Sequence, residues 1–451
     1  MQRIKAFKAY DIRGEWNKDF DADIVYKIGY FLPQLLKADN ILVGRDCRNS
    51  SYEVFEALTA GITDKGANVS DAGYTTTPMI YWGTARYHYP ASVMITASHN
   101  PKSHNGLKIS GADALPVGYD TGLDRLEKMV LDLPTLQKPN KGIVQVMDLI
   151  QPYLQFLKSY KSDLNQLKIG IDCSNGMASL IIKELIENSN TAYINDKADG
   201  NFPGHDPNPL EPSNQRQLKE LVINNNCDIG LIFDGDADRV MFIDENGEFV
   251  SPDLIIALLG HYFFDEKKQK GKVLQDIRSS RAVAEYLQKF GADVETWRVG
   301  RAYGALKLRQ MDGIFGGELA GHYYFRDFYY SDSAMMAALI VLKLLNGFKS
   351  KGMSLSQLVK RISPYYNSGE INFKIADKHE AMEAVKAHFM MQSKPIAFMD
   401  FDGYRLDFKD FWFNIRPSNT EPYLRFLAEA KHEHKLKEVV GQTKEVIKQF
   451  L

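Results

Sequence analysis

Cysteine is scarce in this sequence of 451 residues, where Cys47, Cys173 and Cys227 stand far apart. Three scattered thiols exclude a disulfide framework and a zinc cluster, and free thiols are typical of a reducing cytoplasm. An excess of one charge is lacking too, since 55 Lys and Arg face 57 Asp and Glu, for a formal net charge of −2. This balance provides no global attraction to nucleic acid or to a membrane surface.

Long hydrophobic runs are also missing. The most apolar window, residues 334–345, is interrupted by Lys343 and is shorter than the ~20 residues that span a bilayer. The first eight residues, MQRIKAFK, lack the apolar stretch of a signal peptide. Hydrophobic residues nevertheless make up 44% of the chain and charged residues 25%, a composition that supports several buried cores. We therefore expect a cytoplasmic protein of about three domains, with four possible.

One sequence design occurs three times: an apolar run that ends in Asp, a polar turn and a helical pattern. The runs cover 41–46, 169–172 and 273–276, and they end at Asp46, Asp172 and Asp276. Helical patterns follow at 52–65, at 178–187 and up to about Phe290, and each leads to another short strand. Short apolar strands that alternate with amphipathic helices indicate βαβ units. Since the copies are a domain's length apart, the sequence predicts three similar α/β domains with mixed, mainly parallel sheets.

The C-terminal part of the chain has a different pattern. Mixed strand patterns lie at 370–373, 412–415 and 423–426, and a helix is expected from about His434 to Phe450. Ser363-Pro364 marks a boundary before this part. We expect a smaller α+β domain here, and we assign the four domains to residues 1–145, 146–252, 253–364 and 365–451.

Three carboxylates stand at alternate positions in the segment DGDADR, at Asp234, Asp236 and Asp238. The apolar runs on either side predict two strands joined by a tight turn. Three hard oxygen ligands brought together repel one another unless a cation lies among them, which implies Mg²⁺ or Ca²⁺. Arg239 follows directly and suggests a neighbouring phosphate.

Two other interpretations of this segment are possible. An EF-hand calcium loop shares the spacing, and Glu245 falls at its twelfth position, but Arg239 occupies the sixth position, where that loop needs Gly. The flanks are also strand-like rather than helical. A polar hairpin turn without an ion is the plainest alternative.

Ser98 lies in the segment TASHNP, which follows the apolar run 93–95. The end of such a strand is where α/β folds place their active sites. The G-x-S-x-G pattern of a serine hydrolase is absent here, and His99 is too close in sequence to serve as a base. The residues around Ser98 are rich in hydrogen-bond donors, a setting suited to a phosphorylated side chain: His99, Asn100, His104 and Lys108.

Three further segments carry candidate ligands. In RPSNTEP (416–422), the side chains of Arg416, Ser418 and Thr420, with Arg425 following the segment, make an anion cradle, although an ordinary polar loop would look similar. The segment GGELAGH presents Glu318 and His322, and a carboxylate of this kind commonly binds sugar hydroxyls. The segment YDIRG places Arg13 near the N-terminus, where it could be mere surface charge.

Together these five segments resemble the α-D-phosphohexomutase family, which includes phosphomannomutases, phosphoglucomutases and phosphoglucosamine mutases. They follow the order of the family from Tyr10 to Arg425, nearly the whole chain. The resemblance implies three related α/β domains and a smaller C-terminal domain around a central cleft. It also implies hexose phosphates as substrates, one Mg²⁺ per chain, a phosphoserine and hexose 1,6-bisphosphate as intermediate and activator.

The resemblance also implies roles for individual residues. Mg²⁺ is held by phosphorylated Ser98 together with Asp234, Asp236 and Asp238. The expected catalytic residues are Ser98, Lys108, His322, Arg239 and Arg13. The expected substrate-binding residues are Tyr10, His99, Glu318, Arg416, Ser418, Asn419, Thr420 and Arg425.

Two positions depart from the family pattern. Ala320 stands where the family often has Ser, and Arg301 stands where some relatives have a catalytic His in R-T-G-H. We therefore assign no acid–base role to Arg301, and proton transfer falls to Lys108 or His322.

The sugar is suggested by two segments, 322–328 with Asp332-Ser333 and 205–212, which resemble bacterial phosphomannomutases most closely. We expect a phosphomannomutase that is a monomer or a homodimer, and the resemblance implies that it serves GDP-mannose synthesis. A dual phosphomannomutase/phosphoglucomutase is the close alternative, and a phosphoglucosamine mutase is a more distant one. The non-enzymatic alternatives are a calcium-dependent carbohydrate-binding protein and a family member that binds phosphosugars without turnover.

Overall fold

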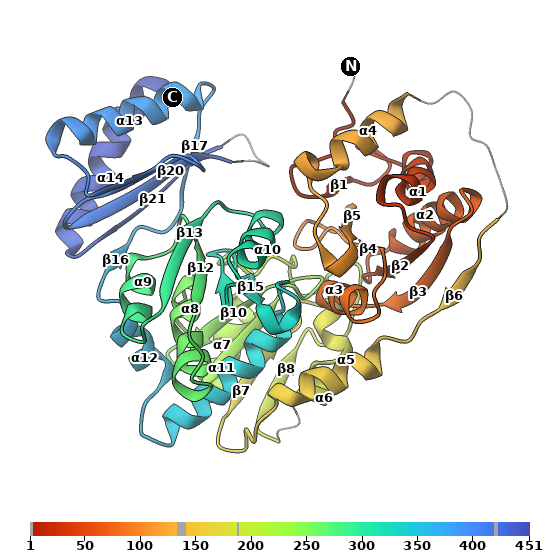
Figure 1. The fold of residues 1–451 in the computed structure, drawn as a ribbon. Helices are drawn as coiled ribbons and strands as arrows, with labels where there is room; N and C mark the ends of the chain where they lie inside the picture. Colours follow the sequence, from red (N-terminus) through yellow and green to blue (C-terminus); the bar gives the residue numbers. More distant parts are fainter. Residues whose placement is uncertain (1–2, 133–140, 187–188, 419–422) are drawn as a thin grey trace.

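A computed structural model describes residues 3–132, 141–186, 189–418 and 423–451 of the chain. The described residues form four sheets (Figure 1). Figure 1 shows the first sheet and the C-terminal domain on opposite sides of the molecule, with the second and third sheets between and below them. In the described part of the chain, every helix falls short of the length and apolar character that a membrane crossing requires.

The first sheet has the strand order β1-β5-β4-β2-β3-β6, and its last four strands run parallel. Its strands are β1 (Ile12–Glu15), β2 (Asn40–Arg45), β3 (Asn68–Tyr74), β4 (Ala91–Ile95), β5 (His104–Gly111) and β6 (Val144–Val146). Its helices are α1 (Ala22–Leu36), α2 (Ser51–Asp64), α3 (Thr77–Arg86) and α4 (Leu123–Leu131).

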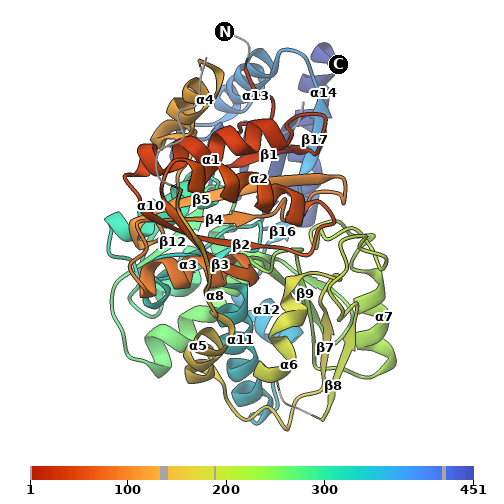
Figure 2. The same cartoon turned by 90° about the vertical axis from the view of Figure 1, so that its right-hand side faces the viewer.

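Alternation along β2 shows how this sheet is covered on both faces (Figure 2). Ile41 and Val43 pack into the core that α1, α2 and α4 close. Leu42 points the other way and packs with Met79 and Ile80 of α3. Helix α3 has a capped start, since the Thr76 side chain accepts a hydrogen bond from Met79 N and Pro78 lies in the first turn.

The second sheet has the order β11-β10-β9-β7-β8. Its strands are β7 (Ile169–Asp172), β8 (Thr191–Ile194), β9 (Ile229–Phe233), β10 (Val240–Asp244) and β11 (Phe249–Val250), accompanied by α5 (Ile150–Leu157), α6 (Ile182–Leu185) and α7 (Arg216–Asn224). The helix expected over 178–187 is wrong in extent, because a 3₁₀ turn, Met177–Leu180, precedes the short α6. The cause is local: Met177 N donates to Gly235 O at 2.9 Å, and Ile181 leaves helical geometry at φ −131°.

The third sheet has the order β13-β12-β14-β15. Its strands are β12 (Lys272–Asp276), β13 (Asp293–Trp297), β14 (Phe315–Gly317) and β15 (Tyr323–Phe325), with α8 (Pro252–Gly260), α9 (Arg281–Gln288), α10 (Arg301–Gln310), α11 (Ala334–Lys349) and α12 (Leu355–Ile362). One continuous core runs from the second sheet into the third. The four domain ranges given above therefore stay predictions.

The fourth sheet is antiparallel and has its own core. Its strands are β16 (Tyr366–Asn367), β17 (Ile371–Lys374), β18 (Ala397–Met399), β19 (Tyr404–Asp407), β20 (Phe411–Pro417) and β21 (Tyr423–Ala430), covered by α13 (Lys378–Gln392) and α14 (Glu433–Ile447). The expected C-terminal α+β unit is confirmed, as is the α/β class of the other three.

The first three sheets share one topological feature that positions the site. In each, a parallel strand of the sheet interior leads through a loop into an antiparallel neighbour: β4 into β5, β9 into β10, and β14 into β15. We call these connections the Ser98 loop (96–103), the acidic loop (234–239) and the glycine loop (318–322). Because parallel strands end at the same edge of a sheet, each loop emerges where α/β folds place ligands.

Candidate active site

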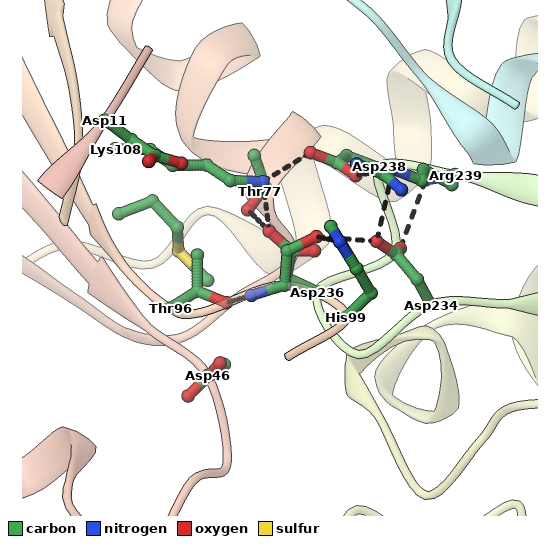
Figure 3. A network of polar contacts seen from close by, with 12 residues as sticks. Asp11, Asp46, Thr77, Thr96, His99, Lys108, Asp234, Asp236, Asp238 and Arg239 are labelled. Carbon is green, nitrogen blue, oxygen red and sulfur yellow. Dashed lines mark hydrogen bonds and ion pairs between the residues drawn. The ribbon is translucent and has the colours of Figure 1, made fainter. Parts of the chain in front are cut away.

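The acidic loop brings its three carboxylates together as the alternate spacing predicted. Asp234, Asp236 and Asp238 are fully buried, and their oxygens lie within 4.8 Å of one another. Strands β9 and β10 flank the loop in antiparallel register, so the strand-like flanks that argued against an EF-hand are confirmed. Figure 3 shows the three side chains converging, with Lys108 reaching them from the first sheet.

Lys108 from β5 is the counter-charge of this cluster. Its Nζ donates to Asp236 Oδ2 at 2.6 Å and to Asp238 Oδ2. Burial opposes the charge of Lys108, but attraction to Asp236 and Asp238 outweighs it, and its pKa is raised. Burial likewise opposes the charge of Asp238, yet the adjacent Lys108 ammonium keeps the pKa of Asp238 below its usual value.

The positive charge close to the cluster does not fully compensate its three carboxylates. Burial, followed by repulsion from Asp238 and Asp236, raises the pKa of Asp234 well above its usual value. The Oδ1 atoms of Asp236 and Asp238 are buried and accept no hydrogen bond from any described residue. Several buried oxygens, all hard ligands, fit a divalent cation such as Mg²⁺.

Ser98 is held against the acidic loop. Its Oγ donates to Asp234 Oδ2 at 2.8 Å and lies 3.3 Å from His99 Nδ1. Its backbone is in the left-handed region, at φ 52°, where a residue with a side chain is uncommon. The Ser98 side chain is buried, while its neighbours His99 and Asn100 line the adjoining cleft.

His322 in the glycine loop stands between two arginines. Arg239 Nε donates to His322 Nε2 at 2.9 Å, so His322 Nδ1 carries the ring proton and donates to Asp332 Oδ2 at 2.7 Å. Asp332 in turn accepts from Arg301 Nε at 3.2 Å. Arg301, which stands where some relatives have a catalytic His, therefore contacts Asp332 and not His322 itself. Its guanidinium lies 3.5 Å from the centre of the Tyr81 ring.

Glu318 is the buried carboxylate of the glycine loop. It accepts hydrogen bonds from the Tyr324 hydroxyl and, at 3.3 Å, from Gly300 N. Burial raises the pKa of Glu318. Glu318 and Ala320 both line the cleft, so the carboxylate is placed to meet a ligand there.

Two arginines of the fourth sheet, Arg416 and Arg425, lie side by side where an anion cradle was predicted. Arg416 and Arg425 face each other directly across β20 and β21, an arrangement that is destabilising for like charges unless anions lie close by. Arg416 Nη1 lies 3.7 Å from Asp402, and Arg425 Nη1 lies 3.0 Å from Glu370. Burial, followed by repulsion from Arg278, lowers the pKa of Arg416. Ser418 lines the cleft beside them, and Asn419 and Thr420 lie outside the described residues.

The N-terminal motif also lies at the cleft. Arg13 bonds to Asp11 and, at 3.2 Å, to Asn100 Oδ1. The Tyr10 hydroxyl donates to Val299 O at 3.2 Å, and its ring lies close against Gly300, whose φ of 122° suits glycine.

A cleft of about 1350 Å³ unites these residues. It is lined from all four sheets by Tyr10, Arg13, His99, Lys108, Asp238, Arg239, Glu318, His322, Arg416, Ser418 and Arg425. Ser98, Asp234 and Asp236 lie just beneath this wall, fully or almost fully buried.

Several contributing residues were not predicted as site residues from the sequence. Thr77, at the start of α3, donates both its N–H, at 2.9 Å, and its hydroxyl to Asp236. Asp332 orients His322, while Asp402 and Glu370 accompany the two arginines of the cradle. The helix-start signal Thr76-Thr77-Pro78 could have indicated Thr77, but the others depend on contacts between distant segments.

Four family models match the chain, and each is described as part of phosphoglucomutase/phosphomannomutase. They are alpha/beta/alpha domain I at residues 4–133, domain II at 151–247, domain III at 251–366 and the C-terminal domain at 370–446.

Individual proteins give the same picture. A phosphomannomutase of Methanocaldococcus jannaschii is 35% identical over 450 residues, which cover 98% of each chain. One of Vibrio cholerae is 36% identical over 447 residues, covering 96% of this chain and 95% of its own. The structure of a phosphoglucomutase/phosphomannomutase family protein of Burkholderia thailandensis matches with a TM-score of 0.87 at 24% identity, over 100% of this chain and 98% of its own. At that identity the structural likeness concerns the fold alone.

Proposed function

Because this chain belongs to the α-D-phosphohexomutase family, and is therefore an isomerase of hexose phosphates, we propose that it is a phosphomannomutase (EC 5.4.2.8). It interconverts mannose 6-phosphate and mannose 1-phosphate. Ser98 carries the phosphoryl group between the two ends of the sugar, with hexose 1,6-bisphosphate as the bound intermediate. Mannose 1-phosphate made in the cytoplasm would supply GDP-mannose synthesis.

The observation that carries this proposal is the 2.8 Å hydrogen bond from Ser98 Oγ to Asp234 Oδ2. It joins a nucleophilic side chain of the first sheet to the acidic loop of the second. The cleft beside it is also lined by Glu318, which can hold sugar hydroxyls, and by Arg416 and Arg425, which can hold a phosphate. A phosphorylated hexose has both hydroxyl groups and a phosphate, so it could be bound by Glu318 and by these arginines at the same time.

The residues present fit Mg²⁺, and Asp234, Asp236 and Asp238 would hold one ion together with a phosphate on Ser98. When bound, Mg²⁺ supplies charge that stabilises the transferring phosphoryl group. Phosphoryl transfer spreads negative charge over three equatorial oxygens, so positioned cations provide most of the catalysis. Arg239 and Lys108 are the cations beside Ser98, and Arg13 is held at the same wall by Asn100.

Proton transfer at the sugar oxygen falls to His322 or Lys108. His322 keeps its Nδ1 proton on Asp332, and Arg239 occupies its Nε2, so Arg239 must turn toward a phosphate before Nε2 can accept a proton. Arg301 holds the other carboxylate oxygen of Asp332 and keeps this orientation. It is a positioning residue here, in place of a catalytic His.

The bisphosphate has to turn around so that its second phosphate meets Ser98. The cradle of Arg416, Ser418 and Arg425 then receives either end of the sugar, and Asn419 and Thr420 complete it by resemblance to the family. Tyr10 and His99 line the same cleft, and in this proposal they would contact the substrate there.

The choice of sugar rests on the resemblance of 205–212 and 322–328 to phosphomannomutases, and on the names of the relatives. Mannose and glucose differ only at C2, whereas Glu318 would bind O3 and O4. A dual phosphomannomutase/phosphoglucomutase is therefore the second candidate. The similar proteins do not support the alternative of a calcium-dependent carbohydrate-binding protein.

Phosphorus NMR tests the proposal directly. The enzyme, Mg²⁺ and a trace of hexose 1,6-bisphosphate are incubated with mannose 1-phosphate or glucose 1-phosphate in parallel, and Ser98→Ala serves as the control. We expect mannose 1-phosphate to become the 6-phosphate, and the variant to lose at least about 10³-fold in kcat because the phosphoryl carrier is gone.

Other results of this experiment would change the assignment. Comparable conversion of both sugars assigns a dual mutase. Conversion by Ser98→Ala at the normal rate contradicts the phosphoserine mechanism. If neither sugar reacts, glucosamine and N-acetylglucosamine phosphates are the next substrates, and turnover of those alone replaces the phosphomannomutase assignment.

A further inference from the structure

The three aspartates that end the repeated strands share one local structure. Asp46, Asp172 and Asp276 each accept a hydrogen bond at Oδ1 from the backbone N–H two residues later, at 3.0, 2.8 and 2.7 Å. Such side-chain caps stabilise a tight turn. Each of these strands pairs in parallel with the strand that leads into a site loop, so turn and loop emerge side by side.

Each turn also holds the neighbouring loop. In the second sheet, Ser174 Oγ donates to Phe233 O at 2.6 Å, directly before the acidic loop. In the third sheet, Asp276 Oδ2 accepts from Leu319 N of the glycine loop at 2.8 Å. The first sheet uses an arginine for this purpose, and its contacts are the most extensive of the three.

Arg48 uses all five of its guanidinium N–H groups. Nε donates to Asp46 Oδ2 at 3.1 Å, and the two Nη atoms donate to four backbone carbonyls of the Ser98 loop and the start of β5. These carbonyls belong to Ser98 at 2.8 Å, Asn100 at 2.7 Å, Pro101 at 2.7 Å and His104 at 3.1 Å. The Arg48 side chain is 0% exposed, so these bonds are made without competition from water.

The same turn touches the domain that carries the acidic loop. The Arg48 guanidinium lies 5.1 Å from the ring centre of Phe202, and Asn49 Nδ2 donates to Asn201 Oδ1 at 3.0 Å. A Cβ at Gly200 would come within 2.4 Å of Cys47 O, so the two segments are in close contact. Arg48 thus contacts the Ser98 loop directly, and through Phe202 it contacts the domain that carries Asp234.

The third copy shows what is particular to the first. Arg278 stands at the matching position, but its Nε and Nη2 donate to Asp276, at 3.2 and 2.7 Å, and its side chain lines the cleft. Arg48 instead lies behind the Ser98 loop, and its two Nη atoms donate hydrogen bonds to backbone carbonyls of that loop and of the start of β5. The left-handed backbone of Ser98 is a conformation that persists only when its surroundings over-determine it.

We propose that Arg48, braced by Asp46, is the positioning residue of the Ser98 loop, and sets the place of Ser98 Oγ relative to Asp234. This rests on the proposed role of Ser98 as phosphoryl carrier. Arg48 touches no reacting atom itself, so its loss is expected to slow transfer while leaving the substrate contacts of Glu318, Arg416 and Arg425 unchanged.

Steady-state kinetics of Arg48→Ala and Arg48→Lys test this role. A displacement of Ser98 by about 1 Å is expected to lower kcat by about 10²-fold, with KM for the hexose phosphate changed by less than about threefold. Lysine keeps the charge but lacks the planar fork, so Arg48→Lys is expected to be almost as slow. Added guanidinium ion, below the concentration that unfolds the protein, restores part of kcat in Arg48→Ala, whereas methylammonium does not.

Arg309→Ala is the matched control. Arg309 Nη2 also donates to two backbone carbonyls, Asp113 O at 2.9 Å and Tyr329 O at 2.8 Å, and its guanidinium also lies over an aromatic ring. It lies away from the site loops, so kcat and KM are expected to stay at the wild-type values. An equal loss of kcat in Arg309→Ala, or a rise in KM with kcat unchanged in Arg48→Ala, overturns the proposal.

Hydrogen–deuterium exchange separates this proposal from the proposed function, since it needs no activity. Peptides covering 96–104 are expected to exchange faster in the Arg48 variants, while those of the C-terminal domain keep their wild-type rates. Unchanged exchange at 96–104, or uniform acceleration across the chain, contradicts a positioning role even if the enzyme proves to be a mutase. If the Arg48 variants fail to fold, Asp46→Asn replaces them, because it keeps an acceptor oxygen but loses the charge that braces Arg48. Peptides covering 96–104 are then expected to exchange faster in Asp46→Asn, and unchanged exchange contradicts the proposal.

Discussion

At the residue scale, the acidic loop concentrates charge that the protein interior disfavours. Three fully buried carboxylates share one ammonium group, that of Lys108, with Arg239 some 3.9 Å from two of them. Buried charges without full compensation destabilise a fold. A cation that enters this cluster therefore stabilises the folded state, and its removal reverses the gain.

Magnesium is thus expected to raise the thermal unfolding temperature, and EDTA to lower it again. A ligand at 100 times its Kd contributes about 2.7 kcal/mol to the free energy of unfolding. Asp236→Asn removes one ligand charge, so its unfolding temperature should respond little to Mg²⁺. Calorimetry across a Mg²⁺ titration measures both, with the exposed Asp265→Asn as control; equal responses in all three proteins would contradict a site at the acidic loop.

At the element scale, one connection type supplies three of the loops at the site. The Ser98, acidic and glycine loops each join a parallel strand to an antiparallel neighbour, and a residue of the adjacent turn (Arg48, Ser174 or Asp276) holds each of them. The segment 205–212 is part of the same design, because His205 bonds to Asp172 and Pro207 lies against Gly235. Its anchoring should therefore influence the acidic loop.

His205 gives this segment a pH dependence. Its Nε2 lies 2.9 Å from Asp172 Oδ2 and its Nδ1 lies 2.8 Å from Asp206 O, so both ring nitrogens face acceptors and favour the doubly protonated ring. Burial lowers the pKa of His205, but the bond to Asp172 outweighs it, and the pKa is raised above 6.5. A raised pKa contributes stability that is fully present below the unfolded value and is lost as pH rises through the folded one.

The difference in unfolding free energy between the wild type and His205→Gln should therefore be largest below about pH 6.5 and shrink at higher pH. Urea unfolding at a series of pH values measures it. His379→Gln, at a histidine in α13 far from this segment, should show no such trend. A difference that grows with pH would mean that His205 folds in its neutral form.

At the scale of the whole molecule, the C-terminal domain has no core in common with the rest among the described residues, and it is joined to the third sheet by hydrogen bonds and by the stacking of Phe401 on Trp297. Arg405 donates to Ile277 O and Ser279 O at 2.8 and 2.7 Å, and Asp402 accepts from Val299 N at 2.7 Å. Its apolar core is separate from the one that unites the second and third sheets. Contacts of this kind permit one domain to move against another.

Substrate is therefore expected to draw this domain over the cleft, if Arg416 and Arg425 bind the phosphate that is not being transferred, as proposed above. The connection at Ser363–Tyr366 should then be protected from proteolysis by hexose phosphate. In Arg416→Ala the protection should require at least about tenfold more substrate, as expected for the loss of a charged hydrogen bond. Limited proteolysis followed by mass spectrometry reads this out, and cleavage at the same rate with and without substrate would exclude the closure.

Much of this protein is determined by its sequence alone, because the signals are local. The repeated run, Asp, turn and helix predicts three α/β units through periodicity, and alternate aspartates between two apolar runs predict a cation site on a hairpin. The segments around Ser98, Glu318 and Arg416 carry their chemistry within a few residues, so a linear pattern is enough to indicate the candidate site. The helix expected over 178–187 was wrong in extent because its first turn is tied to Gly235, nearly 60 residues away.

Only the tertiary structure decided how these segments act on one another. Asp332 behind His322, Arg301 behind Asp332, and Arg48 behind Ser98 are contacts between segments 10 to 50 residues apart. A local sequence pattern does not predict such pairs, because a buried charge can be satisfied by any partner that the packing of sheets and loops brings within hydrogen-bonding distance. The residue types were present in the sequence, but their partners were chosen by the fold.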